Sequence, residues 1–97
     1  MTLYAVRYEY AEGSAVERDR HRPAHVAFLR GLFEADTLVL SGRLEHDDRP
    51  GALIVVRADD PAAVERSLDH DPFWSAGVIR ERDIRTWNVA FAKAALE

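Results

Sequence analysis

Strand-like and helix-like segments follow one another in the order β-α-β-β-α-β along this chain. Period-two alternation or a short continuous apolar run marks the strands, and apolar residues at helical spacing mark the helices. The expected strands cover residues 3–10, 37–44, 51–57 and 77–91. Two right-handed crossovers interleaved in this order give the split βαβ, or ferredoxin-like, fold. The sequence therefore predicts an α+β sandwich, βαββαβ, with a four-stranded antiparallel sheet and both helices on one face.

Prolines mark the expected starts of both helices. Pro23 fits best in the first turn of the first helix, where its missing N–H costs nothing, and this helix should end near residues 35–36. Asp60 is the expected N-cap of the second helix, with Pro61 at its first helical position. The residue before Pro72 is biased away from helical geometry, so the second helix should stop there.

One face of the expected sheet lacks a helical cover. Two helices can cover only one face of a four-stranded sheet. Residues 52–56 are apolar without alternation, which is typical of a strand covered on both faces. Because a monomer would leave this patch exposed to water, the sequence predicts a homodimer formed through the open sheet face, with a small cavity between the protomers.

Length, composition and charge exclude several classes of protein. The 97 residues suffice for one domain, spanning 1–97, of which roughly the last six form a tail. The absence of cysteine excludes disulfides, thiol nucleophiles and iron–sulfur sites. A net charge of −4 disfavours nucleic-acid binding, and no apolar run reaches membrane-spanning length. The N-terminus has no signal-peptide pattern, so we expect a cytoplasmic protein.

The segment HRPAH, residues 21–25, allows three interpretations: metal ligands, a catalytic base beside a bystander, or the capped start of a helix. His21 and His25 could share a helix face only if the helix continued through Pro23, which would remove a hydrogen bond. A metal would also need a third ligand, and no recognisable spacing supplies one. The other side chains considered are His46, Asp47, His70 and Asp71. We therefore expect neither a metal nor a cofactor.

Two short motifs resemble the YCII-related family of small proteins. R-x-x-H is formed by Arg22 and His25, and D-P-F by residues 71–73, followed by Gly77. The resemblance covers about residues 3–88. It implies a dimer of the dimeric α/β-barrel type, with an active site built on a histidine–aspartate pair, here His25 and Asp71.

Two positions depart from the pattern of this family. Asp36 stands where the family often has glycine, and aspartate tolerates the left-handed conformation better than most residues, so the turn should survive. Arg43 stands where the family commonly has proline after Gly42. Its long cation is expected to project into the site and to change the shape of the pocket.

Each candidate residue also has a purely structural explanation. His25 could be a half-buried structural histidine, and Asp71 could simply cap the short turn that follows it. The cluster Arg18, Arg20 and Arg22 could be a solvated helix face or an anchor for a small anion. Trp74 could belong to the core or to a pocket wall. If His25 is functional, its expected place in the first helical turn would favour the neutral ring.

The sequence favours an enzyme of the lyase or isomerase type that needs no cofactor and acts on a small organic, anionic or aromatic molecule. His25 would move a proton as general base and then acid, and Asp71 would fix its tautomer. Arg22 or Arg43 would bind an anionic group of the substrate, and Trp74 would form part of the pocket wall. The alternative is a non-catalytic dimeric module that binds a small ligand or a partner protein. Neither nucleic acid nor a membrane is an expected partner.

Overall fold

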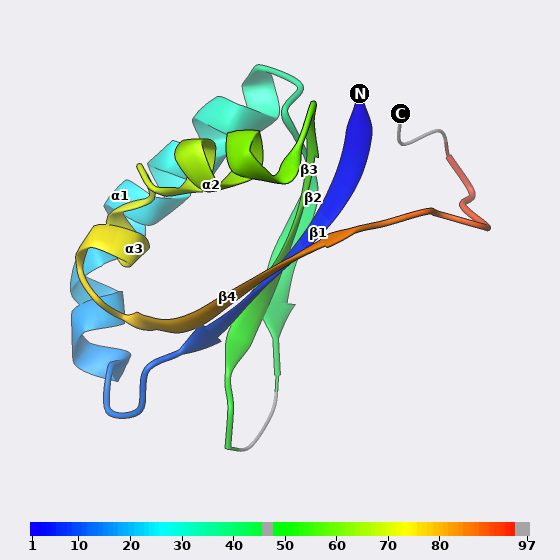
Figure 1. Cartoon of the computed structure of the whole chain (residues 1–97). Helices are drawn as coiled ribbons and strands as arrows, with labels where there is room; N and C mark the ends of the chain where they lie inside the picture. Colours follow the sequence, from blue (N-terminus) through cyan, green and yellow to red (C-terminus); the bar gives the residue numbers. More distant parts are fainter. Residues whose placement is uncertain (46–47, 95–97) are drawn as a thin grey trace.

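A computed structural model describes residues 1–45 and 48–94 (Figure 1). The elements are β1 (Thr2–Tyr10), α1 (Ala15–Glu34), β2 (Leu38–Leu44), β3 (Gly51–Ala58), α2 (Pro61–Leu68), α3 (Pro72–Ser75) and β4 (Ile79–Thr86). The strands form one antiparallel sheet in the order β2-β3-β1-β4. The predicted ferredoxin-like α+β fold is confirmed. His46, Asp47 and the end of the expected tail, residues 95–97, lie outside the described residues.

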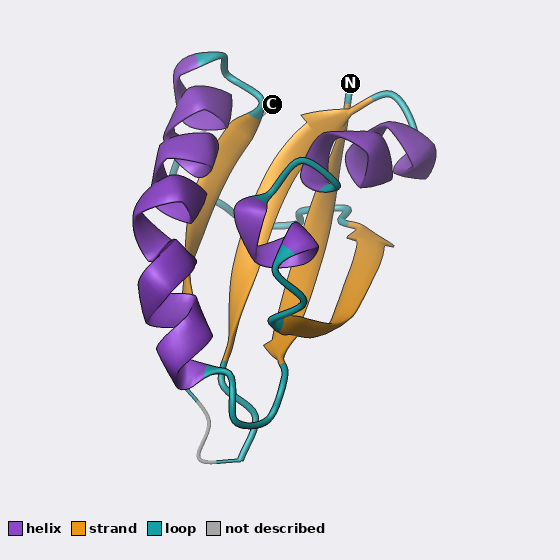
Figure 2. Cartoon of the chain, turned by 90° about the vertical axis from the view of Figure 1, so that its left-hand side faces the viewer, coloured by secondary structure: helices purple, strands orange, loops and turns teal. Residues whose placement is uncertain are grey.

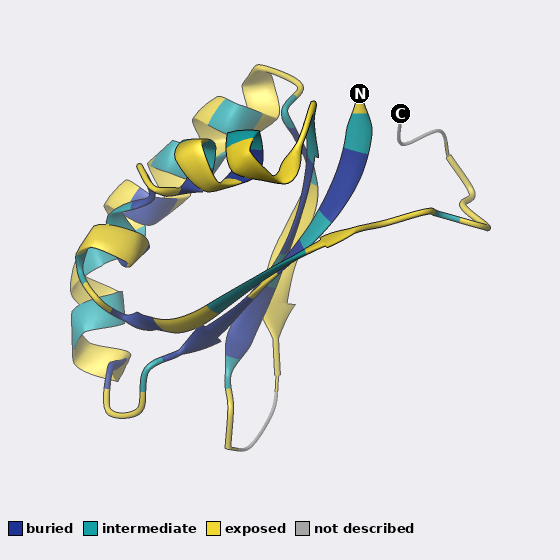
Figure 3. Cartoon of the chain, in the orientation of Figure 1, coloured by how far each residue is buried: buried dark blue, intermediate teal, exposed yellow. Residues whose placement is uncertain are grey.

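The helices of the described chain pack on one face of the sheet (Figures 1 and 2). Alternate residues of the central strand β1 point toward them, so the period-two pattern of the sequence becomes one side of the core. Figure 3 shows this buried band along the central strands. The core residues of β1 are Tyr4, Val6, Tyr8 and Tyr10. Val64 and Leu68 of α2 pack against the same core.

The first helix is longer than the sequence predicts, and the expected start near Pro23 is wrong. Helix α1 begins at Ala15 and contains Pro23 in its interior. Proline there leaves the carbonyl of Asp19 without its helical donor, a cost of about 3 kcal/mol. Packing of the helix against the core offsets this cost through side chains after the proline. These are Phe28, Leu29 and Leu32.

The new helix start changes the interpretation of both histidines. His21 and His25 lie one turn apart on a continuous helix. His25 is therefore not in the first turn, and the argument that the positive helix end favours its neutral ring is wrong, since that effect fades within one turn.

The last strand is shorter than expected because β1, the strand that it pairs with, also ends here. Thr86 of β4 pairs with Tyr4, and the Trp87 N–H still donates to the Leu3 carbonyl at 2.9 Å. Strand β1 begins at Thr2, which lies opposite Asn88 in this register, so residues beyond Asn88 have no β1 residue to pair with. Residues 88–90 have no regular structure.

The expected turns and caps are present. Asp36 has φ 63°, the left-handed conformation that the sequence requires after α1. The Asp60 side chain caps α2 by accepting from the Ala63 N–H at 2.8 Å. No helix in the described part of the chain is long and apolar enough to cross a membrane.

The opposite sheet face carries apolar side chains without a helix over them in the described residues. Register places Ala5, Leu53 and Val55 on this face, because they alternate with the core residues of the same strands. Val55 is buried, whereas Leu53 and Ala5 are partly exposed. The two faces of β3 are therefore both apolar, as its unalternating sequence predicts.

Candidate active site

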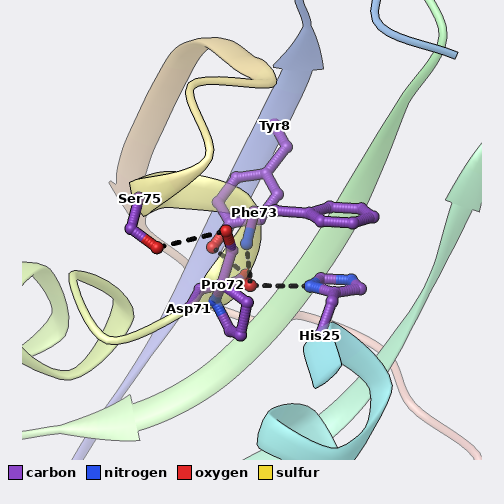
Figure 4. A network of polar contacts seen from close by, with 6 residues as sticks. All are labelled: Tyr8, His25, Asp71, Pro72, Phe73 and Ser75. Atoms are coloured by element: carbon purple, nitrogen blue, oxygen red, sulfur yellow. Dashed lines mark hydrogen bonds and ion pairs between the residues drawn. The ribbon is translucent and has the colours of Figure 1, made fainter. Parts of the chain in front are cut away.

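Asp71 lies at the centre of a buried polar cluster (Figure 4). It is the N-cap of α3, and its Oδ1 accepts from the Phe73 N–H at 2.9 Å. The same oxygen accepts from His25 Nδ1 at 2.7 Å. The carboxyl group has no exposed surface. One carboxylate oxygen of Asp71 therefore serves both the helix cap and the contact with His25.

Tyr8 binds the other carboxylate oxygen of Asp71. The sequence did not indicate Tyr8 as a residue of the site. Tyr8 lies on β1, and its hydroxyl donates to Asp71 Oδ2 at 2.9 Å. Burial, followed by the adjacent Asp71 carboxylate, raises the pKa of Tyr8 well above its ordinary range, so Tyr8 stays a phenol and a donor. The sequence did show an inward tyrosine on a core strand, which needs a polar partner when buried. It could not show which partner.

His25 joins this cluster from α1, and its contact with Asp71 is the one that the sequence predicts. Its ring stacks on Phe73 with centroids 3.9 Å apart and an interplanar angle of 2°. Because an ionised carboxylate only accepts, we assign the shared proton to Nδ1, which leaves the Nε2 lone pair for another group. The histidine side chain is 9% exposed, so access to Nε2 is through a local cavity.

A cavity of about 180 Å³ lies beside the His25 ring. It is lined by residues of α1, the sheet and α3, among them Tyr10, Arg22, Arg43, Ile54 and Phe73. Arg43 thus lines the same cavity as His25. Arg22 pairs with Asp19, and Arg43 Nε lies 2.8 Å from Glu45 Oε1. Both ion pairs are partly exposed and therefore weak, so each guanidinium can turn donors toward an anion.

Trp74 lies outside this cavity. The Arg82 guanidinium stacks over its ring, 3.8 Å from the centroid, and also binds Asp69 at 2.8 Å. Helix α3 is a single short turn, so Phe73 and Trp74 point in different directions, and it is Phe73 that meets His25. Trp74 therefore does not form part of the site that the structure assembles.

The described residues contain no group of three histidine, aspartate or glutamate side chains able to hold a metal ion. His21 is half-buried, and its Nε2 lies 3.5 Å from Glu17 Oε2. The two histidine side chains therefore contact different residues, Asp71 in the case of His25 and Glu17 in the case of His21, although both lie on one continuous helix.

Residues 2–88 match the family described as YCII-related domain. The chain belongs to this family. None of the curated proteins matches its sequence. Among solved structures, this YCII-related chain is similar to 5-chloro-2-hydroxyhydroquinone dehydrochlorinase (TftG) from Burkholderia phenoliruptrix AC1100, which was solved in complex with 2,5-dihydroxybenzoquinone. The TM-score is 0.78 at 22% identity, covering 91% of this chain and 95% of that one.

A candidate antibiotic biosynthesis monooxygenase from Chloroflexus aurantiacus J-10-fl is a more distant match, with a TM-score of 0.46 at 14% identity. It covers 96% of this chain and 100% of that one. The similarity to the TftG structure supports the fold, a ferredoxin-like α+β sandwich.

Proposed function

We propose that this YCII-related chain is an enzyme that uses His25 as a general base and acid on a small anionic or aromatic molecule. The observation that carries this proposal is the 2.7 Å contact between His25 Nδ1 and a fully buried Asp71 at the wall of a cavity. A carboxylate bound to one ring nitrogen fixes the tautomer and stabilises the imidazolium once the other nitrogen takes a proton. This arrangement suits proton transfer.

The proposed reaction is an elimination or an isomerisation. His25 Nε2 removes a proton from a carbon or hydroxyl group of the substrate, and the electron pair left behind either expels a leaving group or shifts a double bond. The imidazolium then returns its proton to the leaving group or to another substrate carbon. Asp71 keeps its hydrogen bond to Nδ1 throughout and takes no part in moving the proton. General acid–base catalysis of this kind typically contributes about 10²–10⁴-fold to the rate.

Two arginines favour an anionic substrate. Arg22 and Arg43 line the same cavity as His25. A guanidinium fork matches the geometry of a carboxylate and also binds a phenolate. The similar TftG structure holds 2,5-dihydroxybenzoquinone, which supports a small cyclic and acidic molecule as the ligand here.

The open sheet face is the proposed dimer interface. Leu53 and Ala5 lie partly exposed on it, beside the buried Val55. A second copy packed face to face would cover these side chains, and the resemblance to the YCII-related family implies such a dimer. A cytoplasmic location stays a prediction from the sequence.

Deuterium incorporation tests the enzymatic proposal. Small phenols, hydroxy acids and keto acids are incubated with the protein in D2O and followed by NMR. We expect at least one compound to exchange or to eliminate, and the His25→Asn variant to react about 10²–10⁴-fold more slowly. His21→Asn, one turn away on α1 and outside the lining of the cavity, is the matched control and should react normally.

The alternative function, a non-catalytic binding module, predicts a different result. Under it, a compound from the same panel binds in the cavity, yet neither the wild type nor His25→Asn exchanges a proton with it. That outcome would reject the enzymatic proposal and leave the cavity as a binding site.

A further inference from the structure

An open apolar groove runs between α1 and the edge strand β2, next to the His25 cavity. Its volume is about 460 Å³, and its walls include Val26, Leu29 and Phe33 of α1 with Leu38 and Leu40 of β2. Figure 2 shows α1 lying lengthwise beside the sheet, and α1 and β2 are in contact. Three of the lining side chains are unusually exposed for apolar residues: Val26 is 41% exposed, Leu40 41% and Phe33 58%.

The groove and the cavity share walls. Val26, Leu29 and Ser41 line both of them. On α1, His25 turns toward Asp71 while the next residue, Val26, faces the groove as well as the cavity. The two hollows therefore form one continuous depression, with the imidazole at its inner end and the apolar groove leading away from it.

Charge is distributed unevenly along this depression. Arg22 and Arg43 line the cavity and not the groove. Arg30 is the one charged residue among those that line the groove. The inner end is thus suited to an anionic group, and the outer part to an uncharged apolar one.

The volumes of the cavity and the groove support a ligand that fills both of them. The cavity of about 180 Å³ is smaller than most pockets for small molecules, which measure about 300–1,000 Å³. The groove and the cavity together fall within that range. We infer that the groove binds the apolar portion, an alkyl chain or a second ring, of an anionic substrate whose reacting end lies at His25. This inference rests on the proposed function for the position of the reacting end.

A series of 4-alkylbenzoates, from benzoate to 4-hexylbenzoate, tests the inference without knowledge of the natural substrate. Binding is followed by NMR through the ring signals of His25 and through dissociation constants. We expect every member to shift the His25 signals, and the affinity to rise up to about fourfold for each added methylene until the groove is filled. Phe33→Ser should remove much of this dependence on chain length while binding benzoate normally.

A matched control comes from the same helix. Val16 is 72% exposed and does not line the groove, so Val16→Ser should leave both the benzoate affinity and the dependence on chain length unchanged. Normal benzoate binding by Phe33→Ser shows that this variant is folded.

Three results would overturn the inference, and they are distinguishable. If benzoate shifts His25 but longer chains bind no better, the groove is not a subsite, and the proposed function stands. If long chains bind through Phe33 without shifting His25, the groove is separate from the site, and the anionic substrate of the proposed function is rejected as well. If Phe33→Ser instead weakens self-association in sedimentation, the groove is covered by a second copy.

Discussion

Tyr8 and His25 bind different oxygens of one buried carboxylate, Asp71 Oδ2 at 2.9 Å and Oδ1 at 2.7 Å. The two donors come from β1 and α1, and the N–H of Phe73 adds a third from α3. A buried carboxylate is stable only when such donors replace its lost hydration. The same three contacts fix the orientation of the carboxylate, which in turn fixes the His25 ring. Stability and the proposed chemistry thus depend on the same hydrogen bonds.

Alkaline pH should destabilise the fold through Tyr8. In the unfolded chain a tyrosine loses its proton near pH 10. In the folded chain burial and Asp71 raise the pKa of Tyr8 well above that, so the phenol keeps its proton. The folded state then binds more protons than the unfolded state above about pH 10, and the free energy of unfolding falls by about 1.4 kcal/mol per pH unit for this one group. Urea unfolding between pH 8 and pH 12 measures the slope.

The Tyr8→Phe variant separates this contribution from others. It should unfold about 1–3 kcal/mol more easily at pH 7, because Asp71 Oδ2 is left without its donor, and its alkaline slope should be smaller. Part of the slope should remain, since burial raises the pKa of Tyr10 as well. An unchanged slope in Tyr8→Phe would contradict the assignment to Tyr8.

Two substitutions of Asp71 distinguish its capping role from its role toward His25. Asparagine caps helices as well as aspartate, so Asp71→Asn should keep the start of α3 while removing the charge that stabilises an imidazolium. We expect a folded protein with strongly reduced activity. Asp71→Ala loses the cap and leaves Tyr8 and His25 without their acceptor, so its melting temperature should fall further than that of Asp71→Asn. Equal melting temperatures would show that the cap contributes little.

Gly51 is required by the close approach of β3 to the carbonyl of Tyr8. An ideal Cβ at Gly51 would lie 1.9 Å from the Tyr8 carbonyl oxygen, so Gly51→Ala must displace the β1 backbone at the residue that holds Asp71. We expect a large loss of stability, together with altered NMR signals of His25. Gly42→Ala is the control, because a Cβ there meets no atom within 4 Å. Similar melting temperatures for the two variants would show that the backbone adapts at little cost.

Much of this fold could be predicted because its local signals agree. The alternating β1, the apolar β3 and the Asp60-Pro61 start of α2 each point to one structure, and the order of elements permits few topologies. The start of α1 could not be predicted in the same way. Residues 15–22 are mostly polar and have no apolar stripe, and ion pairs along the helix join Glu17 to Arg20 at 3.4 Å and Asp19 to Arg22.

The residues of the site could likewise be predicted where a local motif marks them, and not where only distant contacts bring them together. The pairing of His25 with Asp71 was predicted through the resemblance of two motifs to the YCII-related family. Tyr8 was missed because it lies 63 residues from Asp71 in the sequence and belongs to no local motif. Trp74 was assigned to the pocket because it follows Asp71 directly, but the direction of a side chain in a one-turn helix depends on packing, and Arg82 holds the ring elsewhere.

The proposed dimer predicts a mass of about twice the chain mass of 11.0 kDa in light scattering at micromolar concentration. Leu53 lies near the middle of the open face, paired with Arg7 on β1 and with Gly42 on β2. Leu53→Asp should shift the mass toward that of the monomer, because a carboxylate buried between two sheets without a partner costs several kcal/mol. Val16→Asp, on the exposed side of α1, serves as the control and should keep the mass of the wild type.

The Leu53→Asp variant also tells whether the site needs the second copy. His25, Asp71 and Tyr8 all lie on the helix side of the sheet, and their contacts are complete within one chain. We therefore expect the monomeric variant to keep the NMR signals of His25 and to bind benzoate as the wild type does. Altered His25 signals in a variant with normal far-UV circular dichroism would mean that the partner helps to shape the cavity. A wild-type mass of 11.0 kDa would reject the dimer itself.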